Sequence, residues 1–310
     1  MQRSKGGRSM KKKISLRIIR ICIALTLVVA GFLCYAAMCP SHDARTEQTI
    51  GYRNEEYKDS EIWYIGNSNM KTGVIPDVVF NETGLKGYNS GEAYASVKRV
   101  YNITKDGYKY QSPKLVVIET DMLIDPVSNS KSEELIEYKN IFDRFYYNHD
   151  FWIKKAQTDT ISKRHGYKMK KSKYSGKSDY KKKNRQTHFL EENKQIMNQM
   201  LDVIKGKGSE VLFITLPAFN HLNETVLNEI TSYIKDKGEK HIDYSNFDTA
   251  NLNIETSMGE VNHLNISGAY KVSLHLSNYI KKEFSIKKNG EHEKFAKESK
   301  NFIRKYSNKF

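Results

Sequence analysis

The sequence predicts an α/β domain, a three-layer sandwich with a mostly parallel sheet, preceded by one N-terminal transmembrane helix. Residues 115–119 and 210–217 are mostly apolar runs of the kind that form parallel strands buried on both faces. Amphipathic helical patterns alternate with such runs, which is typical of helices that cover both faces of a parallel sheet. The apolar run Ile21–Met38, which follows a basic N-terminus, predicts the transmembrane helix.

The N-terminal apolar run is long enough to act as a membrane anchor. A bilayer needs about 20 apolar residues, and Ile18 and Ile19 extend the run Ile21–Met38 past one charge. A cleaved signal peptide is the alternative, but Cys34-Tyr35-Ala36 fits its cleavage pattern poorly. We therefore expect residues 1–17 to be a basic cytoplasmic tail and residues 18–39 to be a single-pass anchor in the cell membrane. The basic residues before the run, which place the N-terminus in the cytoplasm and the catalytic domain outside the cell, are Arg3, Lys5, Arg8, Lys11, Lys12, Lys13, Arg17 and Arg20.

Composition excludes several classes of function. The net charge of +15 is concentrated in the N-terminal tail, in residues 163–185 and in the C-terminal stretch, so the remaining body is slightly acidic and no nucleic-acid partner is expected. The cysteines, Cys22, Cys34 and Cys39, lie in or beside the apolar run, so the domain has no disulfide and no thiol nucleophile. The sequence shows no metal-ligand cluster, P-loop or dinucleotide motif, and we expect neither a metal nor a cofactor.

The first half of the domain is expected to hold three strands. Residues 40–60 are polar and are interpreted as a linker, and residues 61–283 as the domain. The run Ile62–Ile65 predicts a buried strand that ends in the turn Gly66-Asn67-Ser68. Val78–Phe80 is expected to be a short second strand, and Gly87–Gly91 a turn that opens a helix over 92–101. The third strand is 115–119, with helical patterns around 132–147.

The second half continues the alternation of helices and strands. The pattern predicts a helix over 189–205, a strand over 210–217 that ends at its proline, and a helix over 224–235. A last strand is expected over 241–244 and a final helix over 267–280. In such sheets the working residues follow the carboxyl ends of the strands, and Ser68 is in such a place.

Three residues have the chemistry of a nucleophilic hydrolase or acyltransferase. Glu260 lies three residues before His263, ahead of an amphipathic helix, and Ser68 lies in a strand-end turn. A serine nucleophile needs a histidine base and an acid that orients the imidazole. The turn at Ser68 also fits an ordinary strand-to-helix connection, and Asn265 or Ser267 fits a simple helix cap. Those structural interpretations do not account for the acid-x-x-His spacing.

These motifs resemble the SGNH (GDSL-like) hydrolase superfamily. The match is closest to its membrane-anchored bacterial branch, with the teichoic-acid D-alanylation protein and the polysaccharide O-acetylation proteins, and it covers about residues 61–280. Gly66-Asn67-Ser68 matches the Gly-Asp-Ser block with asparagine in place of the acid, and Asn89-Ser90-Gly91 matches the glycine block loosely. Glu260 and His263 match the Asp-x-x-His block, and the continuation through Ala269 is similar as well.

The resemblance implies an SGNH/flavodoxin-like fold and serine ester chemistry. It implies that Ser68 is the nucleophile, His263 the base and Glu260 the orienting acid, with an oxyanion hole built from the N–H groups of Ser68 and Gly91. The family also has an asparagine donor after the third strand, where this chain has Glu119-Thr120-Asp121. This departure is familiar among polysaccharide-linked members.

Two functions are therefore compared. The first is a membrane-anchored extracellular serine acyl esterase or O-acyltransferase that acts on cell-wall polysaccharide or teichoic acid. The second is a catalytically degenerate SGNH fold that binds envelope polymer or scaffolds a membrane O-acyltransferase. The expected partners are the envelope polymer, a membrane O-acyltransferase and the membrane itself. Asn67, Glu260 and the missing asparagine after the third strand favour the degenerate protein. The intact Ser68, Gly91 and His263 favour the enzyme.

Two further segments are strongly basic. The insert 163–185, which contains Tyr167, Tyr174 and Tyr180, is expected to be a solvated loop that folding does not need; the alternative is an arm that holds anionic polymer or lipid head groups. The basic C-terminal tail 284–310 has helical spacing and is expected to be a surface appendage. The histidines expected to be ordinary surface residues are His165, His188 and His221.

Overall fold

The computed structural model describes residues 5–39, 41, 46, 49–124, 140–150, 152–153, 164–174, 188–219 and 222–310. The chain forms two compact units. The first joins Met1–Ala44 to Ile136–Lys154, and the second joins Arg45–Leu135 to Lys155–Phe310. The first unit contains the apolar helix, and the second contains the sheet.

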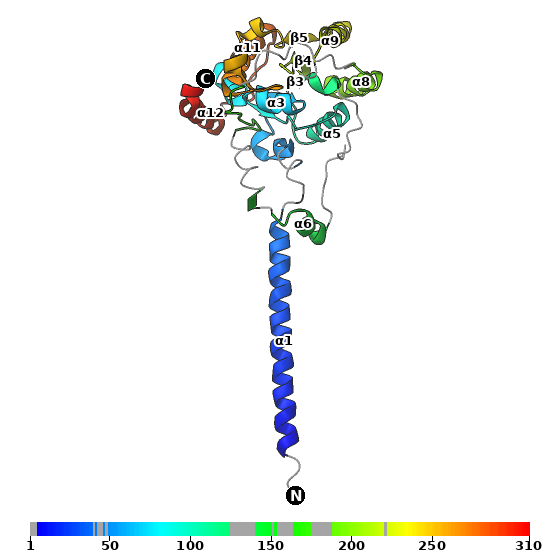
Figure 1. Cartoon of the computed structure of the whole chain (residues 1–310), viewed down its shortest axis with the longest axis vertical. Coiled ribbons are helices and arrows are strands. Elements are labelled where there is room, and N and C mark those ends of the chain that lie inside the picture. The colour runs from blue at the N-terminus through cyan, green and yellow to red at the C-terminus, as the bar shows by residue number, and fades with distance from the viewer. Residues whose placement is uncertain are drawn as a thin grey trace. The chain divides into compact units, whose positions relative to one another are not determined.

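In the first unit, α1 (Lys5–Met38) is the long blue helix of Figure 1. Its 23-residue stretch Leu16–Met38 is long and apolar enough to cross a membrane, by length and composition. The helix begins at Lys5, so most of the expected tail 1–17 is continuous with it. The unit also contains α6 (Ile141–Tyr147), which lies within the helical pattern expected around 132–147. Residues 125–139, including the first part of that pattern, lie outside the described residues.

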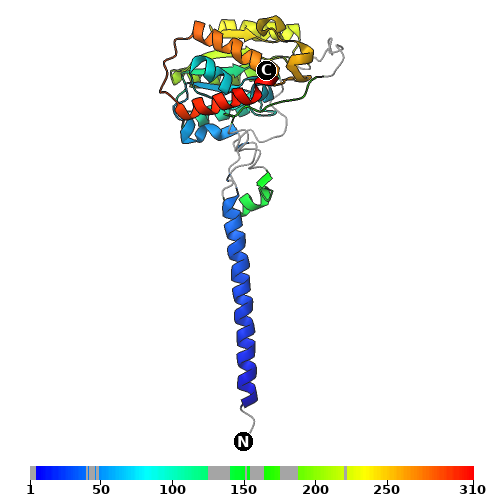
Figure 2. The same ribbon diagram turned by 90° about the vertical axis from the view of Figure 1, so that its left-hand side faces the viewer.

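The second unit is built on a five-stranded sheet in the order β2-β1-β3-β4-β5, with every pair parallel. The prediction of a mostly parallel α/β sheet is therefore confirmed. Figures 1 and 2 show helices on both sides of this sheet. The strands are β1 (Ile62–Ile65), β2 (Gly87–Asn89), β3 (Leu115–Glu119), β4 (Glu210–Thr215) and β5 (Lys240–Asp243).

Alternate strand residues enter two separate cores, which is why the strands are apolar on both faces. In β1, Trp63 and Ile65 belong to one core, whereas Ile62 and Tyr64 belong to the other. The three predicted layers are thus confirmed. The first core is covered by α5 (Val97–Gly107), α8 (Glu191–Gly206) and α9 (Glu224–Asp236), and the second by α3 (Ser68–Gly73), α4 (Pro76–Thr83) and α11 (Ile266–Glu283).

The expected strand Val78–Phe80 is wrong, because these residues lie in helix α4. Pro76 opens this helix at its first turn, where a proline needs no amide hydrogen, and Gly84 closes it in a left-handed conformation at φ 69°. The second strand is instead Gly87–Asn89, where a turn was expected, and the following helix begins at Val97 rather than at residue 92.

The domain also extends beyond both expected boundaries. Residues 40–60 are not only a linker: they include the 3-10 helices η1 (Ile50–Arg53) and η2 (Glu55–Tyr57), whose Tyr52 and Tyr57 are buried in the first core. The expected appendage 284–310 contains α12 (Glu293–Tyr306), which buries Phe295 and Phe302. Apolar residues at helical spacing on a basic segment thus mark a docked helix of the domain. The remaining elements are η3 (Asp121–Leu123), η4 (Phe247–Ala250), α10 (Ile254–Ser257), β6 (Met258–Glu260), β7 (His263–Leu264) and η5 (Ser307–Lys309).

Candidate active site

Ser68 lies where the order of the parallel strands reverses. The order 2-1-3-4-5 places this switch point between β1 and β3, and ligands of such sheets bind there, beyond the carboxyl ends of the strands. Ser68 follows β1 as the first residue of α3. Gly66 makes the connection possible, because a Cβ atom at this position would lie 2.7 Å from the Cβ of Glu119 on β3.

His263 and Glu260 are brought together by a hairpin rather than by a helix. Strands β6 and β7 are antiparallel, and their register pairs Glu260 with His263 across the two turn residues Val261 and Asn262. Directly opposed residues of an antiparallel pair have neighbouring side chains. The acid-x-x-His spacing therefore corresponds to the two ends of a two-residue hairpin turn. After it, Asn265 caps α11 by accepting a hydrogen bond of 3.0 Å from the Gly268 N–H, as the helix-cap interpretation proposed.

The structure brings the three predicted residues into one chain of contacts. His263 Nε2 lies 2.8 Å from Ser68 Oγ, although 195 residues separate them in sequence. On the other side of the ring, His263 Nδ1 lies 2.7 Å from Glu260 Oε1. The second contact is close enough for an ion pair but is not aligned as a hydrogen bond. Base and nucleophile are thus within proton-transfer distance, and the acid is adjacent to the base.

Lys170 is a further residue of this site that the sequence did not indicate. Its ammonium group contacts Glu260 Oε1, the oxygen that also approaches His263. Burial, and then the neighbouring charge of Lys168, lower the pKa of Lys170. The backbone places this lysine firmly, because the Lys170 carbonyl accepts a hydrogen bond of 2.9 Å from the Ile266 N–H. Within a run of many lysines, no local pattern distinguishes this one.

Residues 164–174, which we call the strap, connect several parts of the site. The Lys168 N–H donates to the Lys71 carbonyl of α3 at 2.8 Å, and the Tyr174 N–H donates to the Met258 carbonyl of β6 at 2.9 Å. Tyr167 is fully buried in the second core. The expectation of a solvated insert over 163–185 is therefore wrong for the strap, because its tyrosine and backbone are part of the packed domain. Residues 163 and 175–185 lie outside the described residues.

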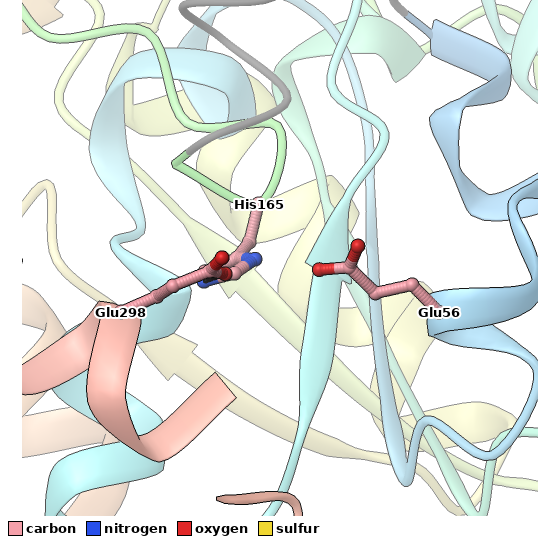
Figure 3. A group of neighbouring side chains, drawn as sticks. All are labelled: Glu56, His165 and Glu298. Carbon is pink, nitrogen blue, oxygen red and sulfur yellow. Dashed lines mark ion pairs between the residues drawn. The ribbon is translucent and has the colours of Figure 1, made fainter. Parts of the chain in front are cut away.

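His165 is likewise not a surface residue. It is fully buried, with Nδ1 3.0 Å from the Tyr57 hydroxyl and Nε2 3.4 Å from the Asp77 carboxylate. Figure 3 shows Glu56 and Glu298 directed toward His165 from separate elements; ligand atoms of these three residues lie within 4.8 Å of one another. Glu56 is already paired with Lys294 of α12 at 2.8 Å. His165 itself joins the strap to α12, because its Nε2 lies 3.8 Å from Glu298 and its ring stacks on Phe295 at 3.7 Å. His188 is exposed, and His221 lies outside the described residues.

Asn67 and the carboxylates after β3 form a buried group beside Ser68. The Asn67 amide donates to Asp121 Oδ2 at 2.7 Å, and its own oxygen accepts from the Asn69 N–H at 2.8 Å. The Asp121 N–H donates to Glu119 Oε1 at 3.0 Å. Burial, and then the charge of Asp121, raise the pKa of Glu119 well above its usual range. Asp121 therefore holds Asn67 of the nucleophile turn, and Glu119 in turn holds Asp121.

The oxyanion donors expected from the sequence differ in their availability. Ser68 is the first residue of α3, and the N–H groups of a first helical turn have no partner within the helix. Gly91, in contrast, donates its N–H to Asn89 Oδ1 at 2.9 Å, so its expected role as a donor is not fulfilled in this arrangement. A glycine is needed there for another reason, because a Cβ atom would lie 2.3 Å from the backbone nitrogen of Lys71 on α3.

Comparisons with known proteins find similarity to solved structures at low sequence identity. No family model matches the chain, and no curated protein matches it in sequence. Among solved structures, it is similar to a protein from Desulfitobacterium hafniense DCB-2 assigned to the G-D-S-L family of lipolytic proteins, with 14% identity and a TM-score of 0.42 over 71% of this chain and 99% of that chain. It is also similar to a protein from Bacteroides fragilis NCTC 9343 assigned as an acylhydrolase, with 13% identity and a TM-score of 0.40 over 81% of this chain and 94% of that chain. At this distance neither structure bears on function, which rests on the site itself.

Proposed function

We propose that this protein is a membrane-anchored serine acyl esterase or O-acyltransferase of the cell envelope. The observation that carries the proposal is the contact between Ser68 Oγ and His263 Nε2 at 2.8 Å, with Glu260 2.7 Å from the opposite ring nitrogen. A serine is activated when its hydroxyl contacts a histidine base and an acid contacts the opposite nitrogen of that histidine.

The reaction follows from these contacts. His263 accepts the proton of Ser68 as Oγ attacks the acyl carbonyl, and Glu260 stabilises the resulting imidazolium. The oxyanion forms next to the N-terminus of α3, where the Ser68 N–H is available and the helix end favours negative charge. The protonated His263 then delivers its proton to the leaving oxygen. Water or a sugar hydroxyl, deprotonated by His263, releases the acyl group from Ser68.

The proposed substrate is an anionic envelope polymer, either cell-wall polysaccharide or teichoic acid. The strap carries Lys168, Lys170, Lys171 and Lys173 next to the hairpin of the site, and such lysines attract phosphate or carboxylate groups. The apolar helix α1 would keep the domain at the membrane, where such polymers and a membrane O-acyltransferase are within reach.

A fluorophosphonate serine probe tests the nucleophile. The full chain in detergent should be labelled, and Ser68→Ala should abolish labelling. The matched control is Ser172→Ala, which removes an exposed hydroxyl of the strap near the same hairpin and should leave labelling unchanged. Labelling that persists in Ser68→Ala would refute the assignment of the nucleophile.

Two observations favour the second function, a degenerate fold that binds polymer without turnover. The Gly91 N–H is engaged by Asn89, and carboxylates stand after β3 where an oxyanion donor would be expected, so among the described residues the Ser68 N–H is the clearest donor. Absence of labelling in the wild type, together with binding of teichoic acid that weakens with added salt, would favour this function. Labelling at Ser68 would exclude it.

A further inference from the structure

The segment 141–153 has an unusual share of exposed large apolar and aromatic side chains. It contains α6 and the residues that follow, of which 140–150 and 152–153 are described. Such side chains are normally covered or are in contact with a partner. Their exposed fractions are 66% for Phe142, 72% for Tyr146, 53% for Tyr147, 55% for Trp152 and 60% for Ile153.

The same segment is attached to the last two turns of α1 within the first unit. The ring of Phe145 lies 4.6 Å from that of Phe32, and the ring of Trp152 lies 5.2 Å from that of Tyr35. The Tyr35 hydroxyl donates to the His149 carbonyl at 2.7 Å. Aromatic side chains of the segment thus pack directly on the apolar helix.

Arg144 fixes this attachment through the backbone of α1. Its guanidinium donates to the Ala37 carbonyl at 2.9 Å and to the Cys39 carbonyl at 3.0 Å. The last carbonyls of a helix have no partner within it, and a cation is favourable at this end. A charged side chain therefore satisfies the C-terminus of α1 while the neighbouring aromatic residues remain exposed.

The position along α1 indicates the depth of the segment. Phe32 lies six residues before Met38, so the contact with Phe145 is about 9 Å below the helix end at 1.5 Å per residue. An amphipathic helix at a membrane surface buries its apolar face about 5–10 Å into the boundary between head groups and acyl chains. Aromatic residues concentrate in that layer.

We propose that residues 141–150, together with Trp152 and Ile153, form a second membrane contact, which lies in the outer interface of the bilayer that α1 crosses. The proposal rests on the membrane anchoring proposed above. Continuity with α1 identifies the partner as lipid, because the exposed aromatic residues adjoin a helix whose apolar stretch is only 6% buried. The chain would then return to the membrane after β3, which would tether the catalytic unit at two points.

The two tryptophans of the chain provide a direct test. Trp152 belongs to this segment and is exposed, whereas Trp63 is fully buried in β1. The full chain is placed in vesicles of phosphatidylcholine brominated either near the glycerol or near the chain ends. We expect a clear loss of tryptophan emission in both, and a larger loss with the shallow bromines.

The control is Trp152→Phe, which leaves only Trp63 and should lose no emission in either vesicle. Extraction of the vesicles at alkaline pH tests the anchoring independently, since a spanning chain stays in the pellet. A chain that stays in the pellet while Trp152 is not quenched would overturn this inference and leave the anchoring intact. A chain that is extracted would instead overturn the anchoring. If Trp152 is not quenched and the protein sediments as a dimer in detergent, the face belongs to a second copy and the lipid proposal is wrong.

Discussion

At the scale of residues, the site departs from the motif that it resembles for reasons that its neighbours explain. Asn67 replaces the aspartate of the Gly-Asp-Ser block, and its amide donates to Asp121 at 2.7 Å. An aspartate here would place two carboxylates at hydrogen-bond distance, which is unfavourable unless one is protonated. Asn67 and Asp121 therefore form one compatible pair, and the substitution is not by itself a sign of lost activity.

Lys170 is expected to lower the effective charge of the orienting acid. Replacing Lys170 by methionine removes the positive charge beside Glu260, so the Glu260 carboxylate stabilises the protonated form of His263 more strongly. The acidic limb of the kcat/KM profile should therefore move to higher pH. The side chains of Lys170 and Glu260 are 26% and 48% exposed, and an exposed ion pair contributes about 0–1 kcal/mol. The shift should therefore be at most about 0.7 pH unit. Lys173→Met, on the same strap, should leave the profile unchanged, and an unmoved profile for Lys170→Met would contradict the expectation.

Glu119 should make the protein less stable as the pH rises. Its raised pKa in the folded state means that folding takes up a proton, so the contribution of Glu119 to the free energy of unfolding is greatest below about pH 4.3, the usual glutamate value, and is lost as the pH rises from there to the raised pKa. Glu119→Gln keeps an acceptor for the Asp121 N–H and removes the titration. We expect a higher Tm than wild type at pH 8 and a difference that shrinks toward pH 4, measured by calorimetry. A variant with the pH dependence of the wild type would contradict this, and the exposed Glu255→Gln serves as the control.

At the scale of elements, the strands and helices that the sequence predicted correctly are the ones whose local residue pattern matches their burial in the fold. Strands β1, β3 and β4 are continuous apolar runs, and each was predicted within two residues. Strand β2 was missed because Gly87-Tyr88-Asn89 has no pattern of its own and is a strand only through its pairing with β1. The valines of α4 favour a strand by propensity, but the Pro76 start and the Gly84 end decide for a helix.

The site was predictable where a motif is local, and not where it depends on tertiary contacts. Glu260 and His263 face each other across a two-residue turn, so their spacing of three residues in the sequence is enough to predict that their side chains are neighbours. The contacts of Lys170 depend on backbone segments that meet only in the fold. The Gly91 N–H is engaged by Asn89 two residues earlier, a local contact that the motif did not indicate. The strap shows the same limit, because a basic composition concealed a buried tyrosine.

The strap should be a structural element, which two changes at Tyr167 can establish. Tyr167→Ala removes a fully buried ring that packs against Phe302 and should cost about 3–5 kcal/mol of the free energy of unfolding. Tyr167→Phe removes only a hydroxyl that has no hydrogen-bond partner among the described residues, so it should be neutral or stabilising. Urea denaturation measures both. An alanine variant as stable as the exposed control Lys173→Ala would mean that the strap is dispensable.

At the scale of the whole molecule, α1, which is basic at its start and apolar afterwards, precedes the unit that contains the proposed site. That site contains lysines as well as a serine and a histidine. The helix would confine the enzyme to the membrane surface, and the lysines would favour anionic polymer over neutral esters. The side of the membrane on which the catalytic unit lies then decides whether envelope polymers are accessible to it at all.

The basic flank of α1 predicts that the catalytic unit faces outward. Positive residues are retained in the cytoplasm, so protease added to intact cells should digest the unit that begins near Arg45 and should spare the N-terminus. Immunoblots with tags at each end measure both outcomes in one sample, and lysed cells provide the control in which both ends are digested. The mass of the membrane-bound protein separates an anchor from a cleaved signal, because only the anchor retains residues 16–38. A C-terminal tag protected in intact cells would place the site in the cytoplasm, where a wall polymer cannot be its substrate.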